Sequence, residues 1–262
     1  MYISINTTVS TSSLVSVFVL SCVLTFTLSM PAATVTIASG ATWQEVAADR
    51  QAYRDASIAT LEPGLPDIPS IPLNTIPLAK QILTDAEVKI TETAVEKLIP
   101  KLANGELSAV EVVKAFLRRA GLAQKAVRLS PPSLQTQLAE YVQTNCVTEL
   151  LPERAFQRAA YLDAYLAEHG RPLGPLHGVP ISVKEHLGME DCDLNGGFVA
   201  WVGRVSKEDA LLLQILWAAG AVFYVRTTQP QSLMHLETSS NLYGYVAIDI
   251  LRLDSRGIER YG

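Results

Sequence analysis

Two short apolar runs that flank a helical pattern constrain the fold of this 262-residue chain more than any other feature. Residues 179–184 read VPISVK, with the proline near the start, and residues 221–226 read AVFYVR without interruption. Runs of this length that are rich in Val and Ile are typical of strands buried in a sheet. We therefore expect two strands of one sheet.

Between the two runs the sequence predicts a helix from Lys207 to Ala219. Ser206 with Asp209 is expected to cap its start, and Gly220 to end it. The apolar residues expected to face inward are Leu212, Leu213, Leu216 and Trp217. Strand, helix and strand in this order form a right-handed crossover, which makes the two strands parallel.

The first half of the chain has helical composition. The sequence predicts helices over Trp43–Ser57, over a block that ends at Leu102 before Asn104-Gly105, over Ala109–Ala120 and over Leu151–Glu168. Ser108 with Glu111 makes a capping box for the third of these helices. The fourth has an inward stripe and then a stop at Gly170; the stripe is Ala155, Ala159, Leu162 and Leu166.

Two segments do not fit a helix or a central strand. Residues 63–77 carry prolines at short intervals and are expected to lie extended over the body of the domain, and residues 124–145 have poor periodicity. The predicted fold class is therefore α/β, with a helical N-terminal half followed by a partial parallel or mixed sheet with covering helices.

Composition excludes several classes of protein. The chain is 48% hydrophobic, which excludes a disordered tail, and its net charge of -5 without a Lys/Arg run argues against nucleic-acid binding. The three cysteines, Cys22, Cys146 and Cys192, are odd in number and lack a CxxC spacing, which argues against a disulfide framework or a structural zinc site. A reducing, cytoplasmic compartment fits best.

The apolar run Leu14–Met30 leaves three interpretations open. Its seventeen residues are marginal for crossing a bilayer, so it could be a membrane anchor. It could be a signal-peptide core, although no Lys or Arg precedes Arg50. Translation could also begin at Met30. The expected organisation is an apolar segment over 1–40, a domain over 41–244 and a tail over 245–262.

Lys184 is the candidate catalytic residue because it ends the first predicted strand. In open α/β sheets, functional groups collect at the carboxyl ends of parallel strands. A lysine at a strand end also simply returns the chain to water. A functional lysine would need partial burial, which disfavours the ammonium form and yields an amine that can accept a proton.

The segment GPLHGVPISVKEHLG (Gly174–Gly188) resembles the GPLHGxPxxxKD segment of the amidase signature family. Three further blocks resemble the fungal acetamidase type of this family; they are GFVAWVG, EDALLLQILWAAGAVFYVRTTQPQ and ETSSNLYG. The resemblance runs from about Trp43 to Gly244, in the family's order, with a gap where residues 124–145 are longer than the family pattern.

The resemblance implies an amidase that hydrolyses carboxamide C–N bonds with a Ser-cisSer-Lys triad, in which Lys184 is the general base. It implies a small-molecule amide substrate and no cofactor. No position matches the family's two serines, because the Gly-rich segment expected soon after Gly244 reads YVAIDILRLDSR instead. We therefore expect a truncated chain that lacks both serines, and the substrate-binding residues, membrane association and oligomeric state stay undetermined.

Other polar residues receive simpler interpretations. Glu185 replaces the aspartate that usually follows the family's lysine and is expected to support it, while Ser239-Ser240 are expected to turn or cap the chain. His177, His186 and His235 lack a metal-ligand spacing such as HExxH and are expected on loops and the surface. Cys192 is expected to be a small apolar filler.

Three hypotheses about function follow. The first is an amidase of which this chain is the N-terminal part. The second is an inactive amidase-like fragment or a binding pseudoenzyme. The third, a membrane-tethered protein, depends on Leu14–Met30 alone.

Overall fold

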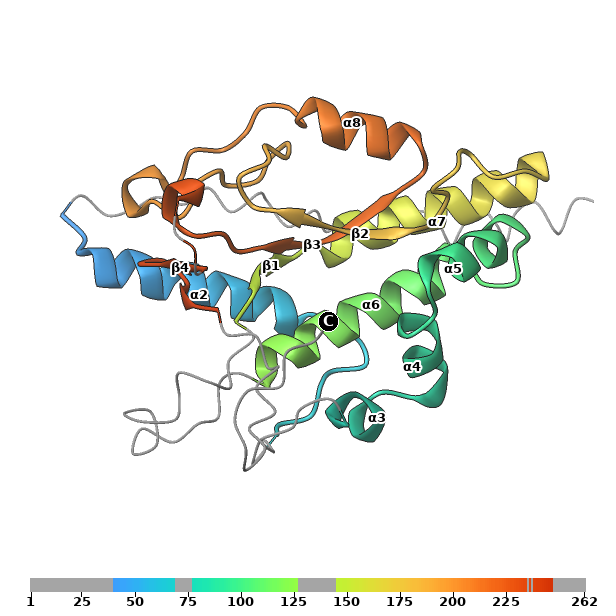
Figure 1. The fold of residues 1–262 in the computed structure, drawn as a ribbon, viewed down its shortest axis with the longest axis horizontal. Helices are drawn as coiled ribbons and strands as arrows, with labels where there is room; N and C mark the ends of the chain where they lie inside the picture. The colour runs from blue at the N-terminus through green and yellow to red at the C-terminus, as the bar shows by residue number, and fades with distance from the viewer. Residues whose placement is uncertain (1–39, 69–76, 127–144, 235, 237, 247–262) are drawn as a thin grey trace, which may run out of the picture. The chain divides into compact units, whose positions relative to one another are not determined.

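The structure is a computed structural model, and it describes residues 40–68, 77–126, 145–234, 236 and 238–246 (Figure 1). The apolar run Leu14–Met30, Cys22, His235 and most of the predicted tail lie outside the described residues. None of the helices in the described part of the chain is long and apolar enough to cross a membrane.

The main sheet has three strands in the order β1-β3-β2; they are β1 (Val147–Leu150), β2 (Pro180–Lys184) and β3 (Val222–Thr227). β2 and β3 are parallel, as the crossover pattern predicts, with Pro180 opposite Val222 and Lys184 opposite Thr227. β1 is antiparallel to β3 and makes the sheet mixed. A separate two-stranded sheet pairs β4 (Ser239–Ser240) with β5 (Gly244–Tyr245), across the predicted domain boundary.

The helices largely follow the predictions. Those described are α2 (Trp43–Ala59), α3 (Leu78–Ile82), α4 (Asp85–Thr91), α5 (Val95–Ala103), α6 (Ala109–Lys125), α7 (Pro152–His169) and α8 (Leu211–Ala218), with 3-10 turns η3 (Val199–Trp201) and η4 (Gln231–Leu233). The predicted block before Asn104 divides into α3, α4 and α5. Gly170 ends α7 in the left-handed conformation, as expected of a glycine stop.

Two hydrophobic clusters involve the main sheet. α6 and α7 pack against β3 through fully buried residues that include Leu117, Leu162 and Val222. α8 contributes Leu213 to a second cluster with Val183 of β2 and Phe223 of β3. Helices therefore cover the strands, as the apolar runs required.

The predicted start of α8 is wrong, and one of its four predicted inward residues does not face inward. The helix begins at Leu211, because Ser206 Oγ donates to the Glu208 carbonyl over 2.8 Å instead of capping a helix. The Asp209 carboxylate is held by Arg154 at 3.1 Å and by the Glu190 N–H at 2.8 Å. Leu213 is buried, and Leu216 and Trp217 pack partly buried against the same cluster, as predicted, but Leu212 is 51% exposed. The helix is apolar on most sides, so its sequence did not show that Leu212 lies outside the inward stripe.

The capping box at the start of α6 gives a pH-dependent prediction. Ser108 Oγ accepts from the Glu111 N–H at 3.1 Å, and the Glu111 carboxylate accepts from the Ser108 N–H at 3.0 Å. The bond from the Ser108 backbone lowers the pKa of Glu111 below its usual value. Since the folded pKa is depressed, Glu111 stabilises the fold above its unfolded pKa, and this contribution is lost as the pH falls through the folded pKa.

We therefore expect Glu111→Gln to lower the free energy of unfolding at neutral pH by under about 1 kcal/mol. The difference from wild type should shrink as urea unfolding is repeated at pH values lowered through the folded pKa. A difference that stays constant with pH would contradict this account.

Candidate functional site

Lys184 lies at the carboxyl end of β2, opposite Thr227 of β3. Its backbone is fixed on both sides, because the Glu185 N–H donates to the Thr227 carbonyl over 2.9 Å and the Leu187 N–H donates to the Lys184 carbonyl over 3.0 Å. The side chain, however, is exposed. Among the described residues, Lys184 therefore lacks the partial burial that a functional lysine would need. The physical reason is that Ser182 and Lys184 alternate with Val183 along β2: Val183 packs inward, while the other two side chains are left exposed.

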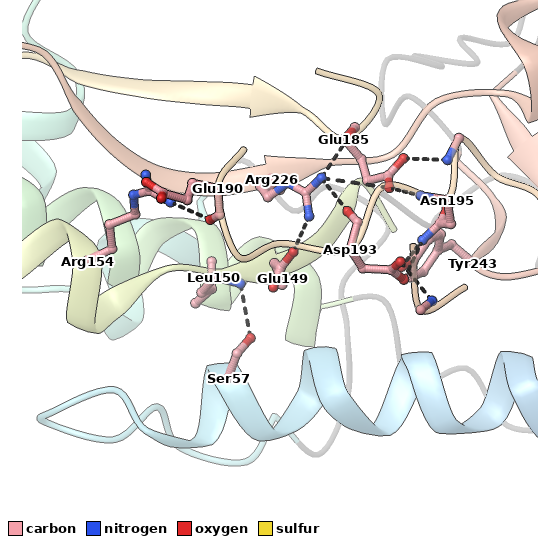
Figure 2. Close-up of polar contacts among 12 residues, drawn as sticks. Ser57, Glu149, Leu150, Arg154, Glu185, Glu190, Asp193, Asn195, Arg226 and Tyr243 are labelled. Atoms are coloured by element: carbon pink, nitrogen blue, oxygen red, sulfur yellow. Dashed lines mark hydrogen bonds and ion pairs between the residues drawn. The ribbon is translucent and has the colours of Figure 1, made fainter. Parts of the chain in front are cut away.

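The Glu185 side chain is buried and holds the loop after β2 in place through hydrogen bonds. It is 1% exposed, and its carboxylate accepts the N–H of Asn195 at 2.7 Å, the N–H of Gly196 at 3.0 Å and the side-chain amide of Gln229 at 2.6 Å. Figure 2 shows Glu185 beside Asn195 and Arg226. Glu185 therefore joins the strand that carries Lys184 to the Gly196-Gly197 turn and to the residues after β3.

Arg226, near the end of β3, is the centre of a buried ionic cluster. Its Nη1 donates to Glu149 Oε1 of β1 over 2.5 Å, and its Nη2 donates to the carbonyls of Glu185 and Asp193 over 2.7 Å each (Figure 2). Arg226 is 1% exposed. One guanidinium on β3 thus connects β1 with the loop after β2. We call Glu149, Glu185, Asp193 and Arg226 the Arg226 cluster.

Burial and charge pairing oppose each other within this cluster. Burial raises the pKa of Glu185 above the usual glutamate value, and the charge of Arg226 counteracts it. Burial also raises the pKa of Asp193, although it accepts the Gly203 N–H at 2.9 Å. Burial tends to lower the pKa of Arg226, but the charges of Glu149, Cys192 and Glu185 and the hydrogen bond to Glu149 together outweigh it and raise the pKa above its usual value. Each charged group of the Arg226 cluster is therefore stabilised by the opposite charge beside it, and removing one would leave another buried without a partner.

The remaining sequence candidates do not form a second reactive centre. Burial raises the pKa of Cys192 to about 11, so its thiol is a weak nucleophile. Ser240 Oγ accepts the Tyr243 N–H at 3.2 Å, which confirms its turn-forming role. The described residues hold no group of three or more His, Cys, Asp or Glu side chains that could bind a metal ion.

His177 departs from its prediction, because it is 3% exposed instead of lying on the surface. Its Nδ1 accepts the Leu173 N–H at 3.0 Å, and burial lowers its pKa. His186 is half-buried beside the end of β2, and burial, followed by the charge of Lys184, lowers its pKa. Both imidazoles are therefore favoured in the neutral form.

The sequence interpretation missed the Arg226 cluster apart from Glu185. The sequence did contain a sign of the cluster, because two charged residues occur within buried strands. Arg226 ends an apolar run, and Glu149 lies between Thr148 and Leu150. Charged groups in buried strands are costly unless paired, so each one predicts a partner. The partner itself lies 77 residues away and leaves no local pattern.

Comparisons with known proteins agree on one family. A family model described as Amidase matches residues 132–248, a range that contains Lys184 and the whole Arg226 cluster. The acetamidase of Emericella nidulans is 38% identical over 206 residues, which are 77% of this chain and 34% of that protein. The acetamidase of Aspergillus oryzae is 36% identical over 211 residues, which are 78% of this chain and 34% of that protein.

A solved structure described as fatty acid amide hydrolase has the same arrangement. It superposes with a TM-score of 0.64 at 34% sequence identity, covering 78% of this chain and 34% of the other. The chain therefore spans about a third of the length of each of these relatives.

Proposed function

Because this chain belongs to the amidase family, we propose that it contributes Lys184 as general base to the hydrolysis of a carboxamide C–N bond. The observation that carries the proposal is the location of Lys184 at the carboxyl end of a strand parallel to β3, inside the segment that matches the family. Functional groups of parallel sheets gather at this end.

The proposed reaction begins with proton transfer. An uncharged Lys184 amine takes the proton of a serine hydroxyl, that serine in turn deprotonates a nucleophilic serine, and the nucleophile attacks the amide carbonyl carbon. The C–N bond then breaks, the nitrogen leaves with a proton, and water releases the acyl group from the serine. This chain offers Lys184 alone to the triad, so both serines are assigned to residues with no counterpart in this sequence.

An amine that accepts protons at neutral pH must be withdrawn from water. Lys184 is exposed among the described residues. The proposal therefore includes that residues outside the described ones cover the Lys184 side chain and exclude water from it. The small amide implied by the names of the two acetamidase relatives is the substrate class that we propose.

Ammonia release from acetamide and benzamide tests this function in a chimera, in which this chain replaces the matching third of the Emericella nidulans acetamidase and the rest of that relative is to provide the serines. Lys184→Ala should reduce the rate at least about 10³-fold, because triad members act as a unit. Lys207→Ala removes another exposed lysine and should leave the rate unchanged. Turnover that survives Lys184→Ala would refute the role of this lysine.

A second candidate function is a non-catalytic, amidase-like binding protein. The exposure of Lys184 favours it, because the proposed hydrolysis requires this side chain to be withdrawn from water. A folded chimera with the Emericella nidulans acetamidase that releases no ammonia from either amide would support this candidate over hydrolysis.

A further inference from the structure

A buried histidine closes the turn that leads into β2. The Leu173 N–H donates to His177 Nδ1 over 3.0 Å, which ties the first part of the turn to the last. The same segment is bound to the residues after α8, because the Gly178 N–H donates to the Gly220 carbonyl over 2.9 Å. β2 then begins at Pro180. We call residues 173–178 the His177 turn, and its closure fixes where β2 starts.

The His177 imidazole is enclosed by the described part of the chain. The residue is 3% exposed, and its Nε2 is buried without a hydrogen-bond partner among the described residues. Segments outside the described residues can cover this position further, but they cannot expose it. The backbone is tightly packed as well, since a Cβ on Gly220 would lie 2.8 Å from His177 Cα. The ring therefore cannot reach water unless the His177 turn opens.

The bond to Leu173 determines which protonation state of His177 fits the closed turn. Nδ1 accepts a hydrogen bond, so it carries no proton, and the neutral ring has its proton on Nε2. Protonation of the ring makes Nδ1 a donor that faces the Leu173 N–H, so this bond is lost. Protonation also places a positive charge in a buried position, which is costly. The closed turn therefore accommodates only the neutral imidazole.

The charged neighbours of His177 do not offset this cost. Burial has the largest effect and lowers the pKa of His177; among the described residues, Asp163 of α7 raises it and Arg158 of α7 lowers it further. The Asp163 carboxylate already accepts the N–H groups of Ala109 and Val110 over 2.7 and 3.1 Å. The other elements packed against the turn contribute side chains that do not titrate; they are Leu102 of α5, Ala109 of α6 and Gly220 after α8.

We propose that His177 is an acid-sensitive latch at the entry to β2: the neutral ring closes the turn through the Leu173 N–H, and protonation opens it. Because the closed turn keeps the ring neutral, the open turn binds a proton more readily below the usual histidine pKa of about 6.5. The closed turn has its full stability above that pH and loses it as the pH falls toward the lowered pKa of the folded state. Within this window the ratio of open to closed turns rises about tenfold per pH unit. The strand that carries Lys184 thus loses its fixed start in acid.

Amide hydrogen exchange at Leu173 tests the proposal, which does not depend on hydrolysis. The exchange rate in the 262-residue chain is followed by NMR and divided by the intrinsic rate at each pH, which gives the protection of this amide. In wild type the protection should be constant above about pH 6.5 and fall about tenfold per pH unit below it. His177→Asn puts an amide oxygen near the position of Nδ1 but cannot titrate, so its protection should not change with pH.

His169→Asn is the matched control, because it removes an exposed histidine at the end of α7. Protection at Leu173 should keep its wild-type pH dependence in this variant. His177→Phe removes the acceptor and should leave Leu173 weakly protected at every pH. Circular dichroism confirms that each variant is folded. If a variant of this chain does not fold, the same exchange is measured in the chimera with the Emericella nidulans acetamidase.

Two results would overturn the proposal. One is a wild-type protection at Leu173 that does not change below about pH 6.5, or that changes equally in His177→Asn. The other is a His177 ring with its proton on Nδ1 at neutral pH. The nitrogen chemical shifts of the ring distinguish the two tautomers in wild type, without any substitution.

Discussion

Replacing Arg226 by methionine should lower the free energy of unfolding by about 3–5 kcal/mol, the cost of leaving buried charge without its partner. Methionine keeps much of the side-chain length but cannot bond to the Glu149 carboxylate or to the carbonyls of Glu185 and Asp193. Urea unfolding followed by circular dichroism measures the loss. The end of β2 should also loosen, and hydrogen exchange at the Glu185 amide should report it.

The control is an exposed ion pair of the same chemical kind. Lys101 Nζ lies 2.9 Å from Glu106 Oε2, and both side chains are well exposed. Lys101→Met should change the free energy of unfolding by less than about 1 kcal/mol. Similar losses for the two variants would mean that the burial of Arg226 is not what makes it important.

Gly220→Ala should be the most damaging single-methyl substitution in the crossover. Gly220 has φ +97°, which disfavours any side chain, and an added Cβ would lie 2.8 Å from His177 Cα and 3.0 Å from His177 N. These are backbone atoms of the segment that enters β2, so they cannot rotate away. Strain and overpacking together should cost about 3–5 kcal/mol, measured as a lower urea midpoint.

Gly170→Ala separates the two causes. Gly170 has φ +62°, but an added Cβ would meet nothing within 4 Å. This variant should lose only the conformational part, about 1–2 kcal/mol. If Gly170→Ala is as costly as Gly220→Ala, the close approach to His177 contributes little.

Local chemistry made much of the fold predictable. The capping box of α6, the glycine stop of α7 and the two parallel strands each depend on residues within a few positions of one another. β1 was missed because its four buried residues include Thr148 and Glu149, which hide the apolar pattern of a strand.

The site was predictable only in part for a related reason. The position of Lys184 at a strand end follows from the apolar run before it, and the family resemblance points to the same residue. Its exposure depends on what covers β2, which is a property of the whole sheet. The pairing of Arg226 with Glu149 is likewise a long-range contact that no local pattern specifies.

The contact between α2 and the β4–β5 hairpin joins the two ends of the described chain. β4 lies beside α2 (Figure 1). Gln51 Nε2 donates to the Leu242 carbonyl over 2.9 Å, and Val46 packs with Leu242 and Tyr243. The two partners of that hydrogen bond are separated by 191 positions in the sequence. At a synthesis rate of roughly 5–20 residues per second, α2 leaves the ribosome roughly 10–40 s before its partner does. During that interval Val46 and Gln51 of α2 lack their native contacts with the hairpin, so this part of the fold is completed only after almost all of the described chain has been synthesised.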